Sequence, residues 1–592
     1  MMKKVLFTLI IGILFLTNMN SQTLVSTDVQ NKNVVLEEFT GIHCGYCPEG
    51  HAISQAIQDD DPGKVVLINI HTGGYATPNE GEPDFRTSFG DAIAGQSNLT
   101  GYPSGTVNRH LYTDLASNGG TAMGRGGWTA ASSRILQEVS PVNVGASTSY
   151  NSSTRELTVN VELYYTGNSA TNSNFINVAL LQSNILGPQT NGGLGNNYVH
   201  KHMLRHLLTD QWGDEITTTT EGTFIQKTYT YTIPADYNGV DCIVENCSIA
   251  VFVTETHQEI LSGTEVQAID GTTLIIASMP EPTNTVLLGN STSTSTFNLS
   301  FTSAIDGDSD FKFTISKLNA PSGWTNSFSI DDNLYTSTGT ITLTGGVAMP
   351  LTIDISPNEN AGFIKYTLKA ESLSNPNAPA LIQNVYVIAN TKTLLVHNQG
   401  SWAGGTPSDF QQDYFDAFIY AGATNFTSSD YKGFMLAASQ NKLSEIQNIF
   451  FNIAWTFPGF TNENVTYFSN FLDNGGNLFV AGQDVGWDTW DTSNGGNGTT
   501  ETQSFYTNYL NADFQADGGT SNNSVNPNVN DDDYAEMGTS SITNIYGGMY
   551  PDEIDAIDNG QTIMYYNNNV TKSCAIKSFN GTYKTIYLGF DP

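Results

Sequence analysis

The hydrophobic pattern of this chain changes along its length, and each change predicts a different kind of domain. Residues 22–138 alternate between strand patterns and helix patterns, which is typical of an α/β domain. From residue 139 to residue 280, apolar and polar residues alternate with a period of two, which predicts an antiparallel β domain. Because 592 residues are too many for one hydrophobic core, several domains are expected.

Two further domains are expected in the second half of the chain. Pro280-Glu281-Pro282 marks a linker, and the strand spacing over residues 281–391 predicts an Ig-like β sandwich. Residues 392–592 return to apolar strands that alternate with helices, which predicts a doubly wound α/β domain. The expected fold class is therefore multidomain α/β plus all-β, with α/β domains at the two ends and two β-sandwich domains between them.

The first 21 residues have the layout of a secretory signal peptide. Lys3 and Lys4 precede the apolar run from Val5 to Leu16, and a polar stretch from Thr17 to Gln22 follows it. The apolar run is shorter than the roughly 20 residues of a membrane-spanning helix, and the cleavage region has no cysteine for lipid attachment. The mature chain is expected to be exported to the periplasm, the outer membrane or the extracellular surface, without a transmembrane segment.

The net charge excludes two classes of partner. The chain has 57 acidic and 22 basic residues, which give a formal charge of −35. Nucleic acids and anionic membranes require a basic surface that releases their counterions, so neither is an expected partner. Other proteins of the cell envelope or cell surface are the expected partners.

Cys44 and Cys47 stand where a predicted strand gives way to a predicted helix. The strand ends at Phe39, and Pro48 suits the first turn of the helix because that position needs no N–H donor. A helix N-terminus stabilises a thiolate, which is the nucleophile of disulfide chemistry. We expect Cys44 to be the exposed attacking thiol and Cys47 the resolving thiol. A redox-active disulfide that exchanges with protein thiols or disulfides follows, and it needs no cofactor and no metal.

The segment from Val35 to Pro48 resembles the strand, loop and helix of thioredoxins. The Gly45-Tyr46 dipeptide between the cysteines is similar to that of bacterial periplasmic disulfide isomerases. This resemblance implies that residues 22–138 form a thioredoxin-like domain. His43 departs from the pattern, because thioredoxins have an aromatic residue before the first cysteine, and a histidine there makes the site more polar.

The same resemblance implies roles for residues outside the dithiol. Glu38 takes the place of the buried acid that passes a proton to the resolving cysteine in thioredoxins. The segment that contains Tyr102 and Pro103 resembles the cis-proline loop, in which Pro103 packs beside the dithiol and holds the substrate backbone. A cis peptide bond before Pro103 is the sharpest structural expectation, because such bonds are rare in folded chains.

A narrower resemblance joins two separate parts of the chain. The run from Glu37 to His51, together with Tyr198 to Arg205, is similar to the Omp-twenty-eight-related outer-membrane proteins of Bacteroidetes. Those proteins join a thioredoxin-like domain to a β domain. The resemblance covers about residues 30–280.

Two other interpretations of the dithiol remain open from the sequence. Export to an oxidising compartment also permits a purely structural disulfide between Cys44 and Cys47. His43 and His51 have a spacing that would allow a metal site with the two cysteines. Haem attachment is excluded, because Pro48 stands where that motif needs a histidine.

The remaining cysteines and a histidine-rich run are given structural roles. Cys242 and Cys247 close a short loop and are expected to form a structural disulfide, and Cys574 is expected to be a buried, inert thiol. His200, His202 and His206, with Arg205, are expected to pack against the N-terminal domain rather than to bind a metal.

The C-terminal domain resembles class I glutamine-amidotransferase-like domains in the run from Phe471 to Gly486. Active members have a nucleophilic cysteine on the sharp turn after such a strand. Here Gln483 and Asp484 occupy that turn, so the domain is expected to be non-catalytic or a binding module. The chain stops at Pro592 without the closing helix of such domains, which suggests a fragment of a longer protein.

Two functions follow from these observations. The first is an exported protein thiol-disulfide oxidoreductase or isomerase that uses Cys44, Cys47, Glu38 and Pro103. The alternative is a non-enzymatic surface binding or adhesion protein, in which the thioredoxin-like domain is a scaffold with a structural disulfide.

Overall fold

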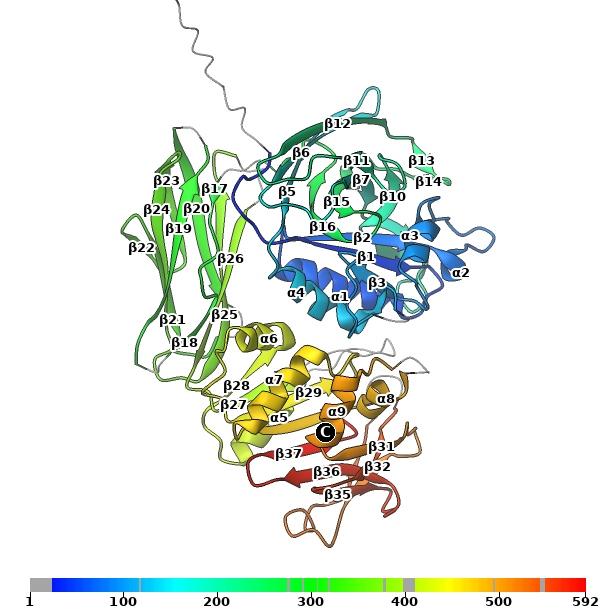
Figure 1. The fold of residues 1–592 in the computed structure, drawn as a ribbon, viewed down its shortest axis with the longest axis vertical. Coiled ribbons are helices and arrows are strands. Elements are labelled where there is room, and N and C mark those ends of the chain that lie inside the picture. Colours follow the sequence, from blue (N-terminus) through cyan, green and yellow to red (C-terminus); the bar gives the residue numbers. More distant parts are fainter. Residues whose placement is uncertain are drawn as a thin grey trace, which may run out of the picture.

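The computed structural model describes residues 24–591 apart from 117–118, 274–276, 290–291, 306, 318–319, 376–379, 398–409, 493–495 and 544–548. The expected signal peptide, residues 1–21, lies outside the described residues. The described chain is mixed α/β, rich in strands and divided into three units (Figure 1). The first unit extends to about residue 270, a green sandwich follows it, and the yellow-to-red C-terminal unit is the third.

The first unit is built on one nine-stranded mixed sheet. The strand order is β16-β15-β7-β10-β2-β1-β3-β4, and β11 pairs with β7. Its strands are β1 (Val34–Thr40), β2 (Val65–His71), β3 (Ser104–Val107), β4 (Met123–Gly124), β7 (Asn174–Gln182), β10 (Met203–Leu207), β11 (Asp214–Ile216), β15 (Cys247–Glu255) and β16 (Ile260–Gln267). The helices of this unit are α1 (Cys47–Asp60), α2 (Gly73–Ala76), α3 (Gly90–Gln96) and α4 (Trp128–Ile135), with short 3₁₀ turns η1 (Arg125–Gly127), η2 (Gly195–Asn197) and η3 (Val244–Asn246).

The predicted strand-helix-strand at the start of the chain is present. Every residue of β1 and β2 is buried, and the two strands pair in parallel from Val34 with Val65 to Thr40 with His71. A parallel pair needs a crossover connection, and α1 supplies it. The helix ends at Asp60, before the Asp61-Pro62-Gly63 turn in which the glycine has a φ of +80°.

The two predicted N-terminal domains share this sheet. Strand β10 pairs in parallel with β2 through Met203 and Asn69. The backbone N–H of Asn69 donates to the carbonyl of His202 at 2.8 Å, and its side-chain amide donates to the carbonyl of Lys201 at 3.0 Å. The boundary expected at residue 138 therefore does not separate two sheets.

A buried ion pair also joins the early and late parts of the unit. Arg109 donates from Nε and from a terminal nitrogen to the two oxygens of Glu37, at 2.7 and 2.6 Å. The other terminal nitrogen of Arg109 donates to the carbonyl of His257 at 3.0 Å. The two hydrogen bonds from Arg109 satisfy both carboxylate oxygens of Glu37, which is the arrangement that allows two opposite charges to be buried together.

A second layer covers the sheet of the first unit. Strands β5 (Val142–Asn151), β6 (Glu156–Tyr165) and β12 (Phe224–Thr232) form an antiparallel sheet in the order β12-β6-β5. Its apolar face packs on β7 and β15 around Leu157, Val159, Val178 and Val251. Two small hairpins complete the unit: β8 (Ile185–Gly187) with β9 (Tyr198–His200), and β13 (Asp236–Tyr237) with β14 (Val240–Asp241).

The middle unit is a two-sheet β sandwich, as the strand spacing predicts. One sheet contains β17 (Ala277–Ser278), β19 (Ser295–Ser303), β24 (Ala348–Ser356), β21 (Thr325–Ile330) and β22 (Asn333–Tyr335). The other contains β18 (Val286–Gly289), β26 (Leu381–Ala389), β25 (Gly362–Ser372), β20 (Asp308–Lys317) and β23 (Thr338–Thr344). Aromatic residues of both sheets, among them Phe301, Phe313 and Phe328, meet in one core.

The C-terminal unit has a mixed nine-stranded sheet. Its strands are β28 (Phe426–Asp430), β27 (Thr393–His397), β29 (Asn448–Ala454), β30 (Asn477–Gly482), β37 (Lys584–Leu588), β36 (Ser573–Phe579), β35 (Gly560–Tyr566), β32 (Ser524–Pro527) and β33 (Ser540–Ser541), in that order. The first five pair in parallel and the rest in antiparallel. A separate hairpin pairs β31 (Ala512–Ala516) with β34 (Glu553–Ala556), and the helices are α5 (Gln411–Tyr420), α6 (Tyr431–Ser439), α7 (Asn462–Asp473), α8 (Val485–Trp490) and α9 (Thr500–Asn508).

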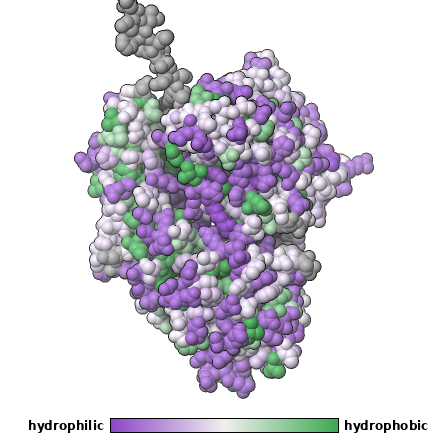
Figure 2. Space-filling model, in the orientation of Figure 1, coloured by the Kyte–Doolittle hydropathy of each residue, from purple (hydrophilic) through white to green (hydrophobic). Residues whose placement is uncertain are grey.

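The first and third units contact each other beside α4. Arg134 of α4 donates to both oxygens of Asp114 at 2.9 and 2.8 Å, and to Glu463 of α7 at 3.1 Å. Tyr431 of α6 packs against the core that contains Trp128 and Ile135. On the face in Figure 2, hydrophilic residues gather around the hollowed centre, and hydrophobic residues are scattered in small groups. Within the described ranges, no helix is long and apolar enough to cross a membrane.

Candidate active site around the Cys44–Cys47 disulfide

The two cysteines of the predicted dithiol are joined as a disulfide. The S–S distance is 2.07 Å, and the bond closes the loop between β1 and α1. Cys47 is the first residue of α1, with Tyr46 as its N-cap and Pro48 in the first turn, as the sequence predicts. The two sulfur atoms that a metal site with His43 and His51 would use as ligands are bonded to each other in this structure.

The expectation that Cys44 is exposed is wrong for this structure. Cys44 is 2% exposed and Cys47 is fully buried. The strand-loop-helix pattern describes only the local chain, and the cover over Cys44 comes from a segment about 145 residues later.

That cover is the loop from Pro188 to Gly192, which follows β8. The side-chain amide of Gln189 donates to the carbonyls of Cys44 and Gly41, at 2.8 and 3.2 Å. The backbone N–H of Thr190 donates to the carbonyl of Ile42 at 2.8 Å, and the Asn191 amide donates to that of Gly45 at 3.2 Å. A Cβ on Gly45 would stand 2.9 Å from the Asn191 amide nitrogen, so a glycine at this position permits the close approach.

Glu38 is fully buried beneath α1, as the resemblance implies. Ser54 of α1 donates to Oε2 of Glu38 at 3.2 Å, while Oε1 accepts no hydrogen bond from the described residues. Burial raises the pKa of Glu38 to about 8, because the charged form loses its hydration; Ser54 and Arg125 oppose this shift. At neutral pH the side chain is therefore mainly a neutral acid.

Pro103 lies beside Glu38 and α1, and its peptide bond with Tyr102 is cis, which confirms the sequence expectation. A Cβ on Gly50 of α1 would stand 2.7 Å from Glu38 Oε1 and 3.2 Å from the Pro103 ring. A glycine at position 50 therefore lets the helix, the acid and the proline pack closely together. The Tyr102 ring contacts that of Tyr75, with centroids 5.5 Å apart.

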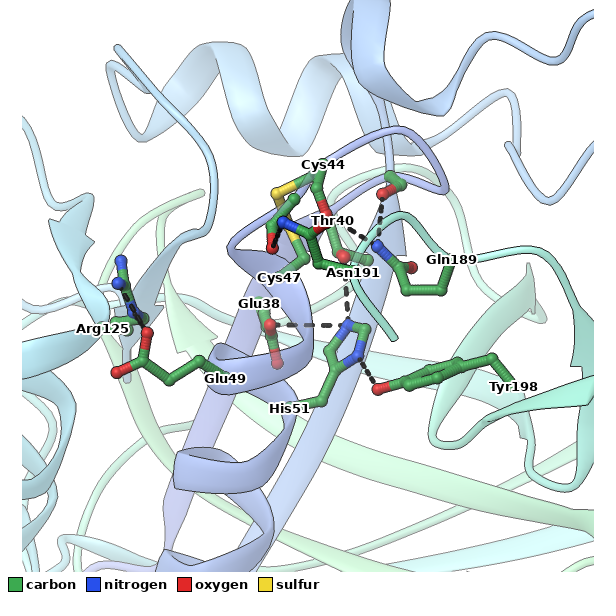
Figure 3. Close-up of a disulfide and its surroundings, with 12 residues drawn as sticks. Glu38, Thr40, Cys44, Cys47, Glu49, His51, Arg125, Gln189, Asn191 and Tyr198 are labelled. Atoms are coloured by element: carbon green, nitrogen blue, oxygen red, sulfur yellow. Dashed lines mark hydrogen bonds and ion pairs between the residues drawn. A yellow bond between two sulfur atoms is a disulfide. The ribbon is translucent and has the colours of Figure 1, made fainter. Parts of the chain in front are cut away.

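His51 connects Glu38 to the surface of the unit, and Figure 3 shows it between Glu38 and Tyr198. Its Nε2 lies 3.0 Å from Thr40 Oγ1 and 3.6 Å from Glu38 Oε1, and its Nδ1 lies 2.7 Å from the Tyr198 hydroxyl. Burial, with the nearby His200 and His202, lowers the pKa of His51 to about 3. The imidazole is therefore neutral at physiological pH.

The expected packing of the histidine-rich run against the N-terminal part is confirmed for His200. Its ring lies 5.4 Å from that of His71 on β2 and 4.9 Å from that of Phe85. Burial lowers the pKa of His200 to about 4, so this ring is also neutral. The His206 ring also packs against the N-terminal part, 5.4 Å from the ring of Phe89, and it stacks on Tyr231 with centroids 4.5 Å apart.

The other predicted supporting residues surround the loop. His43 Nε2 lies 3.0 Å from a carboxylate oxygen of Glu82 and 3.3 Å from the Asn79 amide, so its ring is held by these two residues. Tyr46 is 39% exposed, and the Arg125 guanidinium lies 5.6 Å from the centre of its ring.

Gln189 and Tyr198 are the site residues that the sequence reasoning missed. Tyr198 begins the histidine-containing run that the sequence already singled out, so a signal for it was present. Gln189 lies in a polar, glycine-rich loop without a motif, and no local signal marks it. The described residues contain no cluster of three or more histidine, cysteine or acidic side chains arranged to hold a metal ion.

The disulfide expected between Cys242 and Cys247 is not formed. Both residues are buried thiols, and their sulfur atoms are 3.8 Å apart, nearly twice the length of an S–S bond. The Cys247 thiol donates to the carbonyl of Ile243 at 3.3 Å. Cys574 is a buried thiol within β36, as expected.

The turn after β30 is sharp. Asp484 adopts a left-handed conformation with a φ of +55° at the start of α8. The Trp455 indole donates to Asp484 at 2.9 Å, and burial raises the pKa of this carboxyl group, with a contribution from Asp552. No thiol occupies the turn.

The buried Glu38 gives a testable pH dependence of stability. Its pKa rises from 4.5 when solvated to about 8 in the fold, so the folded state binds the proton more tightly. The protonated Glu38 contributes its full share to the free energy of unfolding below pH 4.5, and this contribution is lost as the pH rises from about 4.5 to about 8. We expect the free energy of unfolding of Glu38→Gln, relative to wild type, to increase over this interval and to level off above it.

Urea denaturation at pH 5.0, 6.5 and 8.5 measures this difference for the transition of the first unit. Because both proteins keep the same histidines, subtraction removes the histidine contribution. A difference that does not change with pH contradicts the assignment of a neutral, buried Glu38.

Because the loop after β8 packs over the segment that contains Cys44, we expect reagents to reach the disulfide slowly. Gln189→Ala removes the two hydrogen bonds that hold this loop to the carbonyls of Gly41 and Cys44. Each such bond contributes about 1 kcal/mol, so reduction of the disulfide by dithiothreitol should accelerate by about fivefold or more. Asn197→Ala, in the exposed turn before β9, is the control and should react at the wild-type rate; an unchanged rate for Gln189→Ala would show that the loop does not limit access.

Comparison with known proteins connects this chain to one family over part of its length. No curated protein matches the chain. Among solved structures, HBP35 of Porphyromonas gingivalis has 15% identity and a TM-score of 0.31, with coverage of 61% of this chain and 98% of that one. A domain of the outer membrane lipoprotein Omp28 from Porphyromonas gingivalis has 20% identity and a TM-score of 0.17, with coverage of 22% and 89%. A protein from Agrobacterium tumefaciens has 13% identity and a TM-score of 0.27, with coverage of 40% and 94%.

The family match lies within the unit that contains the disulfide. The matching family model describes an outer membrane protein, which agrees with the exported, cell-envelope location expected from the sequence. Residues 90–270, from α3 to just beyond β16, match the family model of the outer membrane protein Omp28.

Proposed function

We propose that this chain is an exported thiol-disulfide exchange protein of the cell envelope, with protein thiols or disulfides as its substrates. The observation that carries the proposal is the Cys44–Cys47 disulfide at the first turn of α1, with the neutral acid Glu38 buried beneath that helix. A helix N-terminus favours a thiolate at Cys44, and a protonated acid inside the fold supplies the proton that Cys47 needs when it leaves.

The chemistry requires no cofactor. A thiolate of a partner protein attacks Cys44 Sγ, the Cys44–Cys47 bond breaks, and Cys47 leaves as a thiolate that takes the proton of Glu38. A second thiolate of the partner then attacks the partner sulfur of the mixed disulfide, and Cys44 leaves as a thiolate. Two electrons pass from the partner to the dithiol; the reverse sequence oxidises the partner.

The arrangement of the sheet supports a thioredoxin-like interpretation of the N-terminal part. Strands β2, β1, β3 and β4 are adjacent in that order, with β1 and β2 parallel and β3 antiparallel to β1. Pro103 comes directly before β3 and packs against α1. This position suits a residue that orients the substrate backbone beside the disulfide.

The loop over the disulfide must move for exchange to occur. The loop contacts residues 41–45 mainly through hydrogen bonds from Gln189, Thr190 and Asn191 to backbone carbonyls. A substrate backbone can replace these hydrogen bonds. A partner protein with an extended segment therefore suits the site better than a small thiol.

The C-terminal unit is proposed to be a non-catalytic binding module. Its five parallel strands and the sharp turn at Asp484 support a doubly wound, amidotransferase-like interpretation. Gln483 and Asp484 leave that turn without a thiol nucleophile.

The burial of both cysteines favours a second candidate function. A disulfide that is 2% exposed or less has the accessibility of a structural bond, and the unit would then be the scaffold of a surface binding or adhesion protein.

Exchange activity separates the two candidates. Wild type should accelerate the oxidation of a reduced test protein or the reshuffling of a scrambled one. With Cys44→Ser, the rate should fall to that of the test protein alone. Cys47→Ser should instead accumulate a mixed disulfide with the test protein, because the resolving thiol is absent. Cys574→Ala, which removes a thiol of the third unit, is the control and should retain wild-type activity; equal rates for wild type and Cys44→Ser would establish the scaffold.

A further inference from the structure

We propose that His51 and Tyr198 form the path by which Glu38 exchanges protons with solvent during each cycle of the Cys44–Cys47 disulfide. The inference rests on the proposed exchange function and gives roles to two residues outside the dithiol. His51 belongs to α1, and Tyr198 begins β9, so the path joins parts of the chain that are 147 residues apart.

Glu38 needs such a path because it has no contact with solvent. The carboxyl group must release a proton before it can accept the one that Cys47 loses, and its side chain is fully buried. Proton transfer between buried groups requires donor and acceptor atoms that lie within hydrogen-bond distance or that reach this distance by a small movement.

Two other neighbours of Glu38 do not provide an exit. The Ser54 hydroxyl, which bonds Oε2, is also within 3.2 Å of the carbonyl of His51 and leads back into α1. Arg125 is an obligate cation, and it is paired with Glu49 at 2.6 Å.

His51 is the neighbour that does lead outward. Its Nε2, which the Thr40 hydroxyl contacts at 3.0 Å, is 3.6 Å from Glu38 Oε1, the oxygen without a hydrogen bond. An approach of about half an ångström makes the contact with Glu38 a hydrogen bond that competes with the one to Thr40. Its Nδ1 is already 2.7 Å from the Tyr198 hydroxyl, and Tyr198 is partly exposed. Figure 3 shows Glu38, His51 and Tyr198 in that order, with His51 between the other two side chains.

Burial, together with the neighbouring histidines, keeps the imidazole in the neutral form that a relay needs. His200 and His202 face His51 from β9 and the residues after it, His71 lies beyond them on β2, and Glu38 is the acidic neighbour. A neutral imidazole has one N–H and one free nitrogen, so it accepts a proton at one side and gives one up at the other. Transfer changes only its tautomer and creates no buried charge on the ring.

The proton steps balance with the sulfur chemistry. When a partner disulfide is the oxidant, Cys44 thiolate attacks it and releases one partner thiolate. The Glu38 proton passes to His51 Nε2, the Nδ1 proton passes to the Tyr198 oxygen, and the Tyr198 proton passes to water. The ionised Glu38 then accepts the Cys47 proton, and Cys47 attacks Cys44 Sγ, which forms the disulfide and releases the second partner thiolate.

Single-turnover oxidation of the reduced dithiol by oxidised glutathione tests the path. Tyr198→Phe keeps the ring that packs on His51 and His200 but removes the hydroxyl. Below pH about 8, where Glu38 must first lose its proton, we expect oxidation to slow by about tenfold or more. Above pH about 8, Glu38 is already ionised, and the rate should approach that of wild type. His51→Gln, which bonds but cannot pass a proton, should give the same pH-dependent loss.

The controls separate a proton path from a structural role. Tyr164→Phe, a partly exposed tyrosine of β6, should follow wild type at every pH. The equilibrium redox potential of Tyr198→Phe should equal that of wild type, because a relay changes rates only. Wild-type rates for Tyr198→Phe throughout, or an equal loss at all pH values, would overturn the path and leave the exchange function standing. Failure of the function itself has another signature: wild type would be oxidised no faster than a small free dithiol.

Discussion

The pairing of β10 with β2 is the constraint on which the rest of the site depends. It is short, yet Asn69 fixes it with a backbone and a side-chain hydrogen bond to residues 201 and 202. This junction makes one sheet from two segments that are far apart in sequence. The chain just before β10 is thereby laid across the end of α1, which brings Gln189 over the disulfide and Tyr198 against His51.

Burial at this junction determines the charge states of the site. Glu37 and Glu38 are neighbours on β1 and therefore point to opposite faces of the sheet. Glu37 meets Arg109, which bonds both of its oxygens, whereas Glu38 accepts a hydrogen bond from a serine hydroxyl and faces a neutral imidazole, and Arg125 offsets only part of the effect of its burial. One carboxyl group is held as half of an ion pair, and the other has its pKa raised to about 8. A carboxyl group that is mainly protonated at neutral pH beneath a disulfide is a direct result of this difference.

Local patterns in the sequence predicted the parts of the site that lie close together in the chain. The apolar run of β1 and the helix start at Cys47 follow from short-range signals, and the cis bond before Pro103 was expected from the resemblance to the cis-proline loop. The burial of Cys44 depends instead on Gln189 and Asn191, which have no motif and reach the disulfide only through the shared sheet. For Cys242 and Cys247, proximity in sequence was a poor guide, because the turn between them brings the sulfur atoms into contact without a bond. The strand register that creates such contacts is set by long-range packing, which a single sequence does not display.

The central claim is that Cys44–Cys47 is a disulfide for exchange rather than a structural bond. Equilibration of the protein with glutathione buffers of graded potential, followed by thiol labelling and mass analysis of the peptide with Cys44 and Cys47, measures its reduction potential directly. The account predicts a midpoint less negative than about −300 mV, within reach of cellular thiol-disulfide partners. A midpoint well below about −300 mV would identify a structural bond and contradict the claim.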